Sequence, residues 1–108
     1  MPSPSAAKVV LEAQLAELEG RQQRLAQDLA EPLNRDSSEQ AVEVEDDVAL
    51  EQQAALIARE VASVRRALTR IENGTYGSCA RCGDGIGSKR LEVRPEAALC
   101  IDCARNEQ

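Results

Sequence analysis

The chain has 108 residues, a net charge of −6 at pH 7 and one aromatic residue, Tyr76. This length suits a single domain, and the acidic excess argues against direct binding to duplex DNA, because phosphate affinity depends mainly on lysine and arginine. The chain contains no histidine, which excludes imidazole catalysis and mixed cysteine–histidine metal sites. So short a chain with so few large apolar side chains usually needs an additional staple to fold.

The hydrophobic residues do not predict membrane insertion. No apolar run approaches the ~20 residues needed to span a bilayer. Glu12 interrupts the first apolar run too early for a signal peptide. We therefore expect a cytoplasmic protein without membrane contact. Four cysteines in that reducing compartment favour a metal or redox site over a disulfide framework.

Residues 5–30 have the pattern of a first helix. Ser3 and Ser5 are candidate N-caps. Pro32 disfavours helical geometry in the residue before it, so the helix should end near Ala30. Within the helix, side chains at alternating spacings of four and three form a coiled-coil seam with one polar interruption. The seam consists of Leu11, Leu15, Leu18, Gln22, Leu25 and Leu29.

A second helix is predicted from about 38 to 73, where Asn73-Gly74 is a typical helix stop. The short connection makes the two helices antiparallel neighbours. Residues 1–73 are therefore predicted to form an antiparallel coiled-coil hairpin with its tip near 31–41. Toward the tip, Glu43 and Asp47 fall where apolar residues would continue the seam. The second seam consists of Leu50, Ala54, Ile57, Val61, Val64, Leu68 and Ile71.

Acidic residues are concentrated near the predicted tip. Residues 1–73 carry 14 acidic and 8 basic side chains, which accounts for the whole charge of −6. Complementarity to the helix dipole explains part of this distribution, because acids stabilise the start of a helix. An acidic tip with a functional role is the second interpretation. Seven acids and no base lie between 36 and 51: Asp36, Glu39, Glu43, Glu45, Asp46, Asp47 and Glu51.

Two Cys-x-x-Cys pairs, Cys79/Cys82 and Cys100/Cys103, are separated by seventeen residues. Such knuckles supply four sulfur ligands for a tetrahedral Zn²⁺ with no open position, and the spacing is that of a zinc ribbon. A redox dithiol, an iron site and disulfides are the alternatives; the first lacks a βαβ frame, and the last suits a cytosolic chain least. We predict one structural Zn²⁺ in residues 74–108, contributing on the order of 10 kcal/mol to folding.

The predicted fold class is mainly α, a helical hairpin followed by a small zinc-ribbon-like module. In the module, "KRLEVRP" (89–95) is predicted to be a strand of a short strand pair, because Leu91 and Val93 alternate with charged residues. The stretch "PEAALCIDCARNEQ" (95–108) is predicted to be a short C-terminal helix bearing the second knuckle.

Three further side chains near the cysteines have a structural and a functional interpretation. Tyr76 is expected to fill the core between the hairpin base and the zinc module rather than to act as a stacking platform. Arg90 and Arg94 alternate with acids. They are therefore expected to form a solvated face more readily than a partner contact.

The run from "YGSC" through "CGDGIGSKRLEVRPEAALCIDC" (76–103) resembles the zinc-finger module of the DksA/TraR family. The resemblance implies a factor that binds bacterial RNA polymerase directly, without contacting promoter DNA. In that family the coiled coil enters the secondary channel of the polymerase, and acidic residues at its tip alter the lifetime of promoter complexes. Besides the cysteines, the likeness rests on Ile86-Gly87, Arg90-Leu91-Glu92, Arg94-Pro95 and Leu99-Cys100-Ile101-Asp102-Cys103.

The family's tip pattern, Asp-x-x-Asp-x-Ala, falls on "DSSEQA" when counted back from Cys79 without gaps. Asp36 and Ala41 match, and Glu39 replaces the second aspartate. The extra methylene moves the carboxylate, and a misplacement of ~1 Å matters at a tight active centre. Asp36 and Glu39 also fit a capping box, which would mount both carboxylates rigidly. We interpret Asp36, Glu39 and Ala41 as the partner-binding tip.

The chain resembles a short form of the family, because five residues follow Cys103. Longer members bind guanosine tetraphosphate jointly with polymerase, through side chains that include basic ones. At the positions that correspond to these side chains, the same alignment places mostly uncharged or acidic residues. We therefore expect a weak or absent response to this nucleotide. The corresponding positions are Leu56, Glu60, Ser63 and Ala104, with Arg94 keeping a base.

These features are compatible with three functions. A monomeric, non-enzymatic transcription regulator that binds polymerase is favoured. A zinc-stabilised coiled-coil adaptor that binds another protein is the alternative, because long exposed heptads are credible interaction surfaces. An enzyme or thiol redox protein fits least, because histidine is absent and a metal site with four cysteine ligands leaves no coordination position open.

Overall fold

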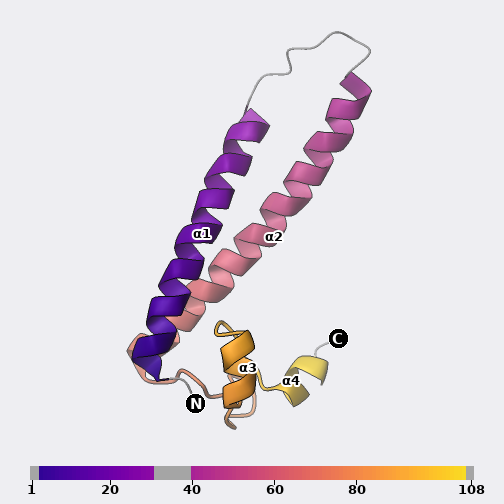
Figure 1. Cartoon of the computed structure of the whole chain (residues 1–108). Helices are drawn as coiled ribbons and strands as arrows, with labels where there is room; N and C mark the ends of the chain where they lie inside the picture. The colour runs from indigo at the N-terminus through magenta and orange to yellow at the C-terminus, as the bar shows by residue number, and fades with distance from the viewer. Residues whose placement is uncertain (1–2, 31–39, 107–108) are drawn as a thin grey trace. The chain divides into compact units, whose positions relative to one another are not determined.

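The computed structural model describes residues 3–30 and 40–106, and side chains within 3–29 and 48–106. The described part of the chain is helical apart from the turns around the cysteines (Figure 1). Two long helices run antiparallel, as the short connection between them predicts, and two short ones follow (Figure 1). The helices are α1 (Pro4–Ala30), α2 (Gln40–Asn73), α3 (Ser88–Val93) and α4 (Ile101–Asn106).

The chain forms two compact units. One combines Met1–Leu15 with Ala62–Gln108 and is called the zinc unit below; the other is Ala16–Val61, called the distal unit. Each unit therefore contains part of both long helices. The predicted boundary between residues 73 and 74 coincides with the end of α2. That it is also a boundary between two domains stays a prediction.

The predicted seams are the buried faces of the long helices. In the zinc unit, Leu11 and Val64 are completely buried. In the distal unit, Leu18 and Leu25 of α1 are buried, and Ile57 of α2 is half-buried. The heptad analysis missed Ala7 and Ala67, which are also buried because small side chains allow the helices to approach closely.

Both predicted ends of the long helices that lie in the zinc unit are confirmed. The Ser3 hydroxyl accepts a hydrogen bond from the Ala6 amide at 3.1 Å and thus caps α1. At the other end, α2 stops at Asn73, and Gly74 has a φ of 77°, the left-handed conformation that glycine adopts without strain. The Thr75 amide then closes the helix on the Arg70 carbonyl at 2.9 Å.

The predicted strand over residues 89–95 is wrong, because this segment forms helix α3. Leu91 is buried whereas Val93 is 81% exposed. Residues two apart lie on one face of a strand but on nearly opposite sides of a helix. The extended pairing that remains in the described residues is one isolated bridge between Ser78 and Gly85.

The predicted helix over residues 95–108 is confirmed only in part, because α4 begins at Ile101 and residues 94–100 are not helical. α4 carries the second knuckle, with Cys103 inside the helix and Cys100 just before it. Tyr76 is buried, and its ring lines a groove together with α1 and α3 residues that include Val10 and Leu91. It is therefore core filler, as expected. Within the described residues, no helix combines the length and hydrophobicity required to cross a bilayer.

Replacing Leu11 by alanine should lower the free energy of unfolding by about 2–5 kcal/mol, because it removes a completely buried side chain from the seam. Urea denaturation of the zinc-loaded chain followed by circular dichroism measures this change. The matched control is Val9→Ala on the same helix, where the side chain is 68% exposed and the change should stay within about 0.5 kcal/mol. Equal losses in the two variants would contradict the assigned helix face.

Candidate functional site

The four cysteine side chains converge on one point. Their Sγ atoms all lie within 4.8 Å of one another, and the Sγ atoms of Cys82 and Cys100 are 3.8 Å apart. Four sulfurs about 2.3 Å from a central zinc stand about 3.8 Å apart at the edges of a tetrahedron. The two pairs thus provide the ligands of one Zn²⁺, as the sequence predicts.

The first knuckle is a tight turn held by its own backbone. The Cys79 amide donates to the Asp84 carbonyl at 2.7 Å, and the Gly83 amide donates to the Cys79 carbonyl at 3.0 Å. Gly83 has a φ of 82°, which a residue with a Cβ rarely adopts. The bridge between Ser78 and Gly85 closes the turn, so both thiols of this knuckle face the same point.

The second knuckle depends on a side chain that the sequence placed on the surface. Arg90 of α3 donates from Nε to the carbonyl of Leu99 at 2.9 Å, directly before Cys100. Its expected role on a solvated face is therefore wrong for this residue. Arg94 is exposed, as expected.

Without metal, neighbouring thiols oppose one another's ionisation at part of the site, since they raise the pKa of Cys103. Backbone amides, that of Cys82 first, lower the pKa of the Cys79 thiol to about 6. Neighbouring thiols, that of Cys100 first, raise the pKa of Cys103 to about 12. A divalent cation removes this conflict by neutralising the thiolates. With four protein ligands no coordination position stays open for water, so the zinc supplies a structural crosslink.

The predicted tip lies mostly outside the described residues. Asp36 and Glu39 fall in residues 31–39, which are not described. Ala41 follows the first residue of α2, and its side chain is also outside the description. The tip therefore stays a prediction from sequence.

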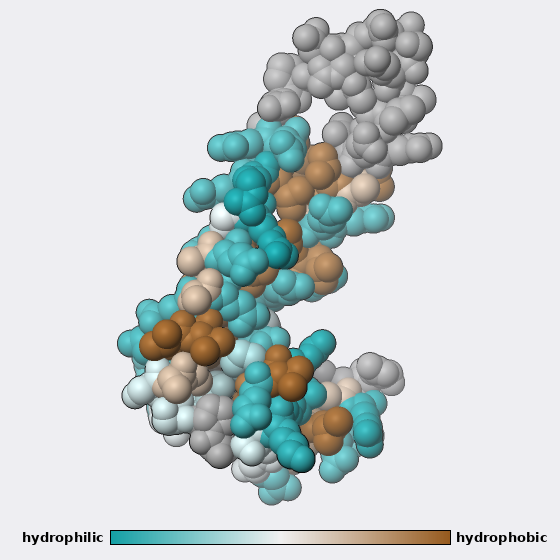
Figure 2. Space-filling model, viewed as in Figure 1, coloured by the Kyte–Doolittle hydropathy of each residue, from teal (hydrophilic) through white to brown (hydrophobic). Residues whose placement is uncertain are grey.

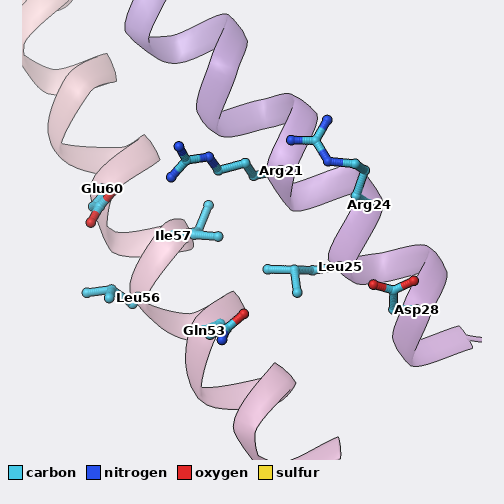
Figure 3. A pocket seen from close by; sticks show the side chains of 8 residues that line it. All are labelled: Arg21, Arg24, Leu25, Asp28, Gln53, Leu56, Ile57 and Glu60. Atoms are coloured by element: carbon cyan, nitrogen blue, oxygen red, sulfur yellow. The ribbon is translucent and has the colours of Figure 1, made fainter. Parts of the chain in front are cut away.

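The distal unit has a groove between its two helices that sequence reasoning missed. It has a volume of about 420 Å³. Leu25 and Ile57 reach toward each other across it, with Arg21 and Arg24 on one side of them and Asp28 on the other (Figure 3). Leu56 is 49% exposed and lies off the heptad seam. A leucine outside the seam is the sequence feature from which this groove could have been predicted. The lining residues are Arg21, Arg24, Leu25, Asp28, Gln53, Leu56, Ile57 and Glu60.

On the face seen in Figure 2, apolar side chains of the described residues are open to solvent in several separate places. On the zinc unit, Val93 and Ile101 are exposed and line a second shallow groove together with Lys89 and Arg94. This surface is both apolar and basic. It suits contact with a protein that is acidic at its rim.

A helical hairpin joined to a closed four-cysteine zinc site defines a small zinc-finger protein built around a helix pair. Residues 74–108 match the family described as prokaryotic DksA/TraR C4-type zinc finger. Residues 8–71 match the N-terminal domain of the DnaK suppressor protein-like family. The chain belongs to the DksA/TraR family.

Related proteins agree with this assignment. The RNA polymerase-binding transcription factor DksA of Escherichia coli K12 is 44% identical over 43 residues, which cover 40% of this chain and 28% of that protein. The protein of the same name from Haemophilus influenzae is 45% identical over 40 residues, covering 37% and 28%. The matched stretch thus spans less than a third of these relatives.

Solved structures extend the likeness to nearly the whole chain. Transcription factor DksA2 from Pseudomonas aeruginosa superimposes with a TM-score of 0.84 at 27% identity, covering 96% of this chain and 81% of that one. DnaK suppressor protein from Agrobacterium tumefaciens C58 gives a TM-score of 0.68 at 30% identity, covering 96% and 93%.

Elemental analysis of the purified chain should find one zinc per molecule. The Cys82→Ser variant should bind zinc more weakly by over a hundredfold, because loss of a ligand costs more than the roughly 10–100-fold of an outer-shell change. Arg81→Ser, in the same knuckle but exposed, is the control and should keep its zinc. Full zinc occupancy of Cys82→Ser under chelator competition would contradict the ligand set.

Proposed function

We propose that this chain is a transcription regulator that binds bacterial RNA polymerase directly and has no enzymatic activity of its own. The observation that carries the proposal is the joint match of the hairpin and the zinc module to one family. Relatives in that family are named RNA polymerase-binding transcription factors. The likeness to transcription factor DksA2 over 96% of the chain extends the argument beyond the zinc module.

In this proposal the hairpin enters the secondary channel of the polymerase, and its tip modulates initiation. The support is the charge pattern, since seven acids and no base lie between residues 36 and 51. The carboxylates of Asp36 and Glu39 would act electrostatically on Mg²⁺-linked or loop contacts near the active centre. Ala41 would permit close approach because its side chain is small.

The zinc unit would serve as the anchor at the rim of the channel. Its exposed apolar and basic surface, which includes Val93 and Arg94, supports this role. Promoter DNA is not contacted in this scheme, in keeping with the net charge of −6. We propose that the protein acts as a monomer in the cytoplasm.

A second candidate is an adaptor that binds a different protein. The groove of the distal unit favours it, because an exposed leucine beside an apolar floor is a docking feature that does not require polymerase (Figure 3). Polymerase binding discriminates the two. If the purified chain fails to co-purify with core polymerase at micromolar concentration, the adaptor is the better proposal.

Substitutions at the tip should abolish regulation while preserving binding. With purified polymerase, Asp36→Asn and Ala41→Thr should leave affinity within about threefold but reduce the change in promoter-complex lifetime by at least about tenfold, because a misplaced group at a reacting centre has effects of that order or more. Promoter-complex decay measures this change. Glu72→Gln removes the same charge from an exposed position of α2 outside residues 36–51 and is the control. If all variants bind and regulate alike, residues 36–41 are only a turn.

Guanosine tetraphosphate should change transcription little through the positions that correspond to the nucleotide site of longer family members. The positions that correspond to the binding residues of longer members include Leu56 and Glu60, which offer no positive charge to a polyphosphate. In vitro transcription with the chain present, with and without the nucleotide, tests the expectation. Polymerase alone gives the background response. A large synergistic effect of chain and nucleotide would show the expectation to be wrong.

A further inference from the structure

The segment Pro95–Leu99 joins α3 to the second knuckle without regular secondary structure, and it is called the strap below. Backbone carbonyls outside helices and sheets need other donors. Each of the five strap carbonyls accepts a hydrogen bond. In chain order, the donors are the Tyr76 hydroxyl at 2.9 Å, Arg70 Nη2 to both Glu96 and Ala97 at 3.3 Å, the Ala80 amide at 2.8 Å and Arg90 Nε at 2.9 Å.

These donors come from the elements that surround the zinc site. Arg90 belongs to α3, Ala80 to the first knuckle, and Tyr76 follows α2. Arg70 is in the last turn of α2 and holds two adjacent carbonyls at once. The strap ends at Leu99, directly before Cys100, so its position fixes where the second pair of thiols begins.

Arg70 is itself held in place by the hairpin. Its helix packs through Val64 and Ala67, which are completely buried in the zinc unit. The guanidinium is partly removed from solvent, and this burial lowers its pKa from the ordinary value. The Arg70 side chain therefore forms a direct connection between the packed end of α2 and the backbone that leads to a zinc ligand.

We propose that Arg70 is a positioning residue that couples zinc binding to the packing of the hairpin base. With the strap held, Cys100 and Cys103 are ordered before the metal arrives, so binding costs less conformational entropy. Coupling between two equilibria is reciprocal. Zinc therefore stabilises the end of α2 through the strap, and the packed end of α2 increases zinc affinity. The inference rests on the zinc site and is independent of the proposed polymerase partner.

Chelator competition with the full chain measures the first half of this coupling. Arg70→Met keeps much of the aliphatic volume but removes both hydrogen bonds, and should lower zinc affinity roughly tenfold, within the range usual for coupled sites. Arg66→Met removes the same charge from an exposed position one turn earlier and should stay within about twofold of the unmodified chain. Unchanged zinc affinity in Arg70→Met would overturn the proposal.

Thermal unfolding of the helices with and without zinc measures the second half. The rise in Tm on zinc loading should be smaller in Arg70→Met than in Arg66→Met. A merely structural role would lower both forms equally and leave that rise unchanged, which would also overturn the proposal. If Arg70→Met does not fold, Tyr76→Phe removes only the hydroxyl donor to the strap and keeps the buried ring. Tyr76→Phe should lower zinc affinity by about threefold. An unchanged zinc affinity would contradict the proposed coupling.

Discussion

The conflict among four closely spaced thiols is the constraint on which the zinc unit depends. Within 4.8 Å of one another they resist common ionisation, as the raised pKa of Cys103, caused first by the neighbouring Cys100 thiol, expresses. One divalent cation turns this repulsion into attraction. The apparent free energy of such binding, on the order of 10 kcal/mol, rivals the whole stability of an ordinary domain. Few large apolar side chains are buried around the zinc site. Two of them are Leu91 in α3 and Ile86, which lies just before that helix.

Zinc binding of this free energy can stabilise the module without a β-sheet. The backbone between the knuckles then pairs its carbonyls with whatever donors the neighbouring elements can extend. Arginine and tyrosine suit this task, because their donors stand at the end of long side chains whose stems pack against apolar surface. Arg70, Tyr76 and Arg90 each reach a strap carbonyl in this way. Arg90, which the sequence analysis expects on a solvated face, is consequently an internal support.

This difference explains what could be predicted from sequence. Periodic or punctuated signals succeeded: the leucine seam of α1, the stop at Asn73-Gly74 and the paired cysteines each follow from a spacing rule. The strand prediction failed because Leu91 and Val93, two residues apart, satisfied a period of two over a segment too short to test a helical period. The contacts of Arg70 and Arg90 leave no periodic trace, since their partners are backbone atoms 26 and 9 residues away.

Because a zinc with four protein ligands has no open coordination position, the function must depend on surface contacts and charge. Exposed charges are screened within about 8–10 Å at physiological salt, so an acidic segment can act only on groups it is brought against. In the proposed function, this requirement explains why the acids are concentrated in residues 36–51 instead of being spread along the chain. If the same seven charges were dispersed over α1, which has 27 residues and a length of about 40 Å, each would have fewer acidic neighbours within one screening length. Their concentration near the turn is what would give two carboxylates enough local potential to compete for a metal-linked contact.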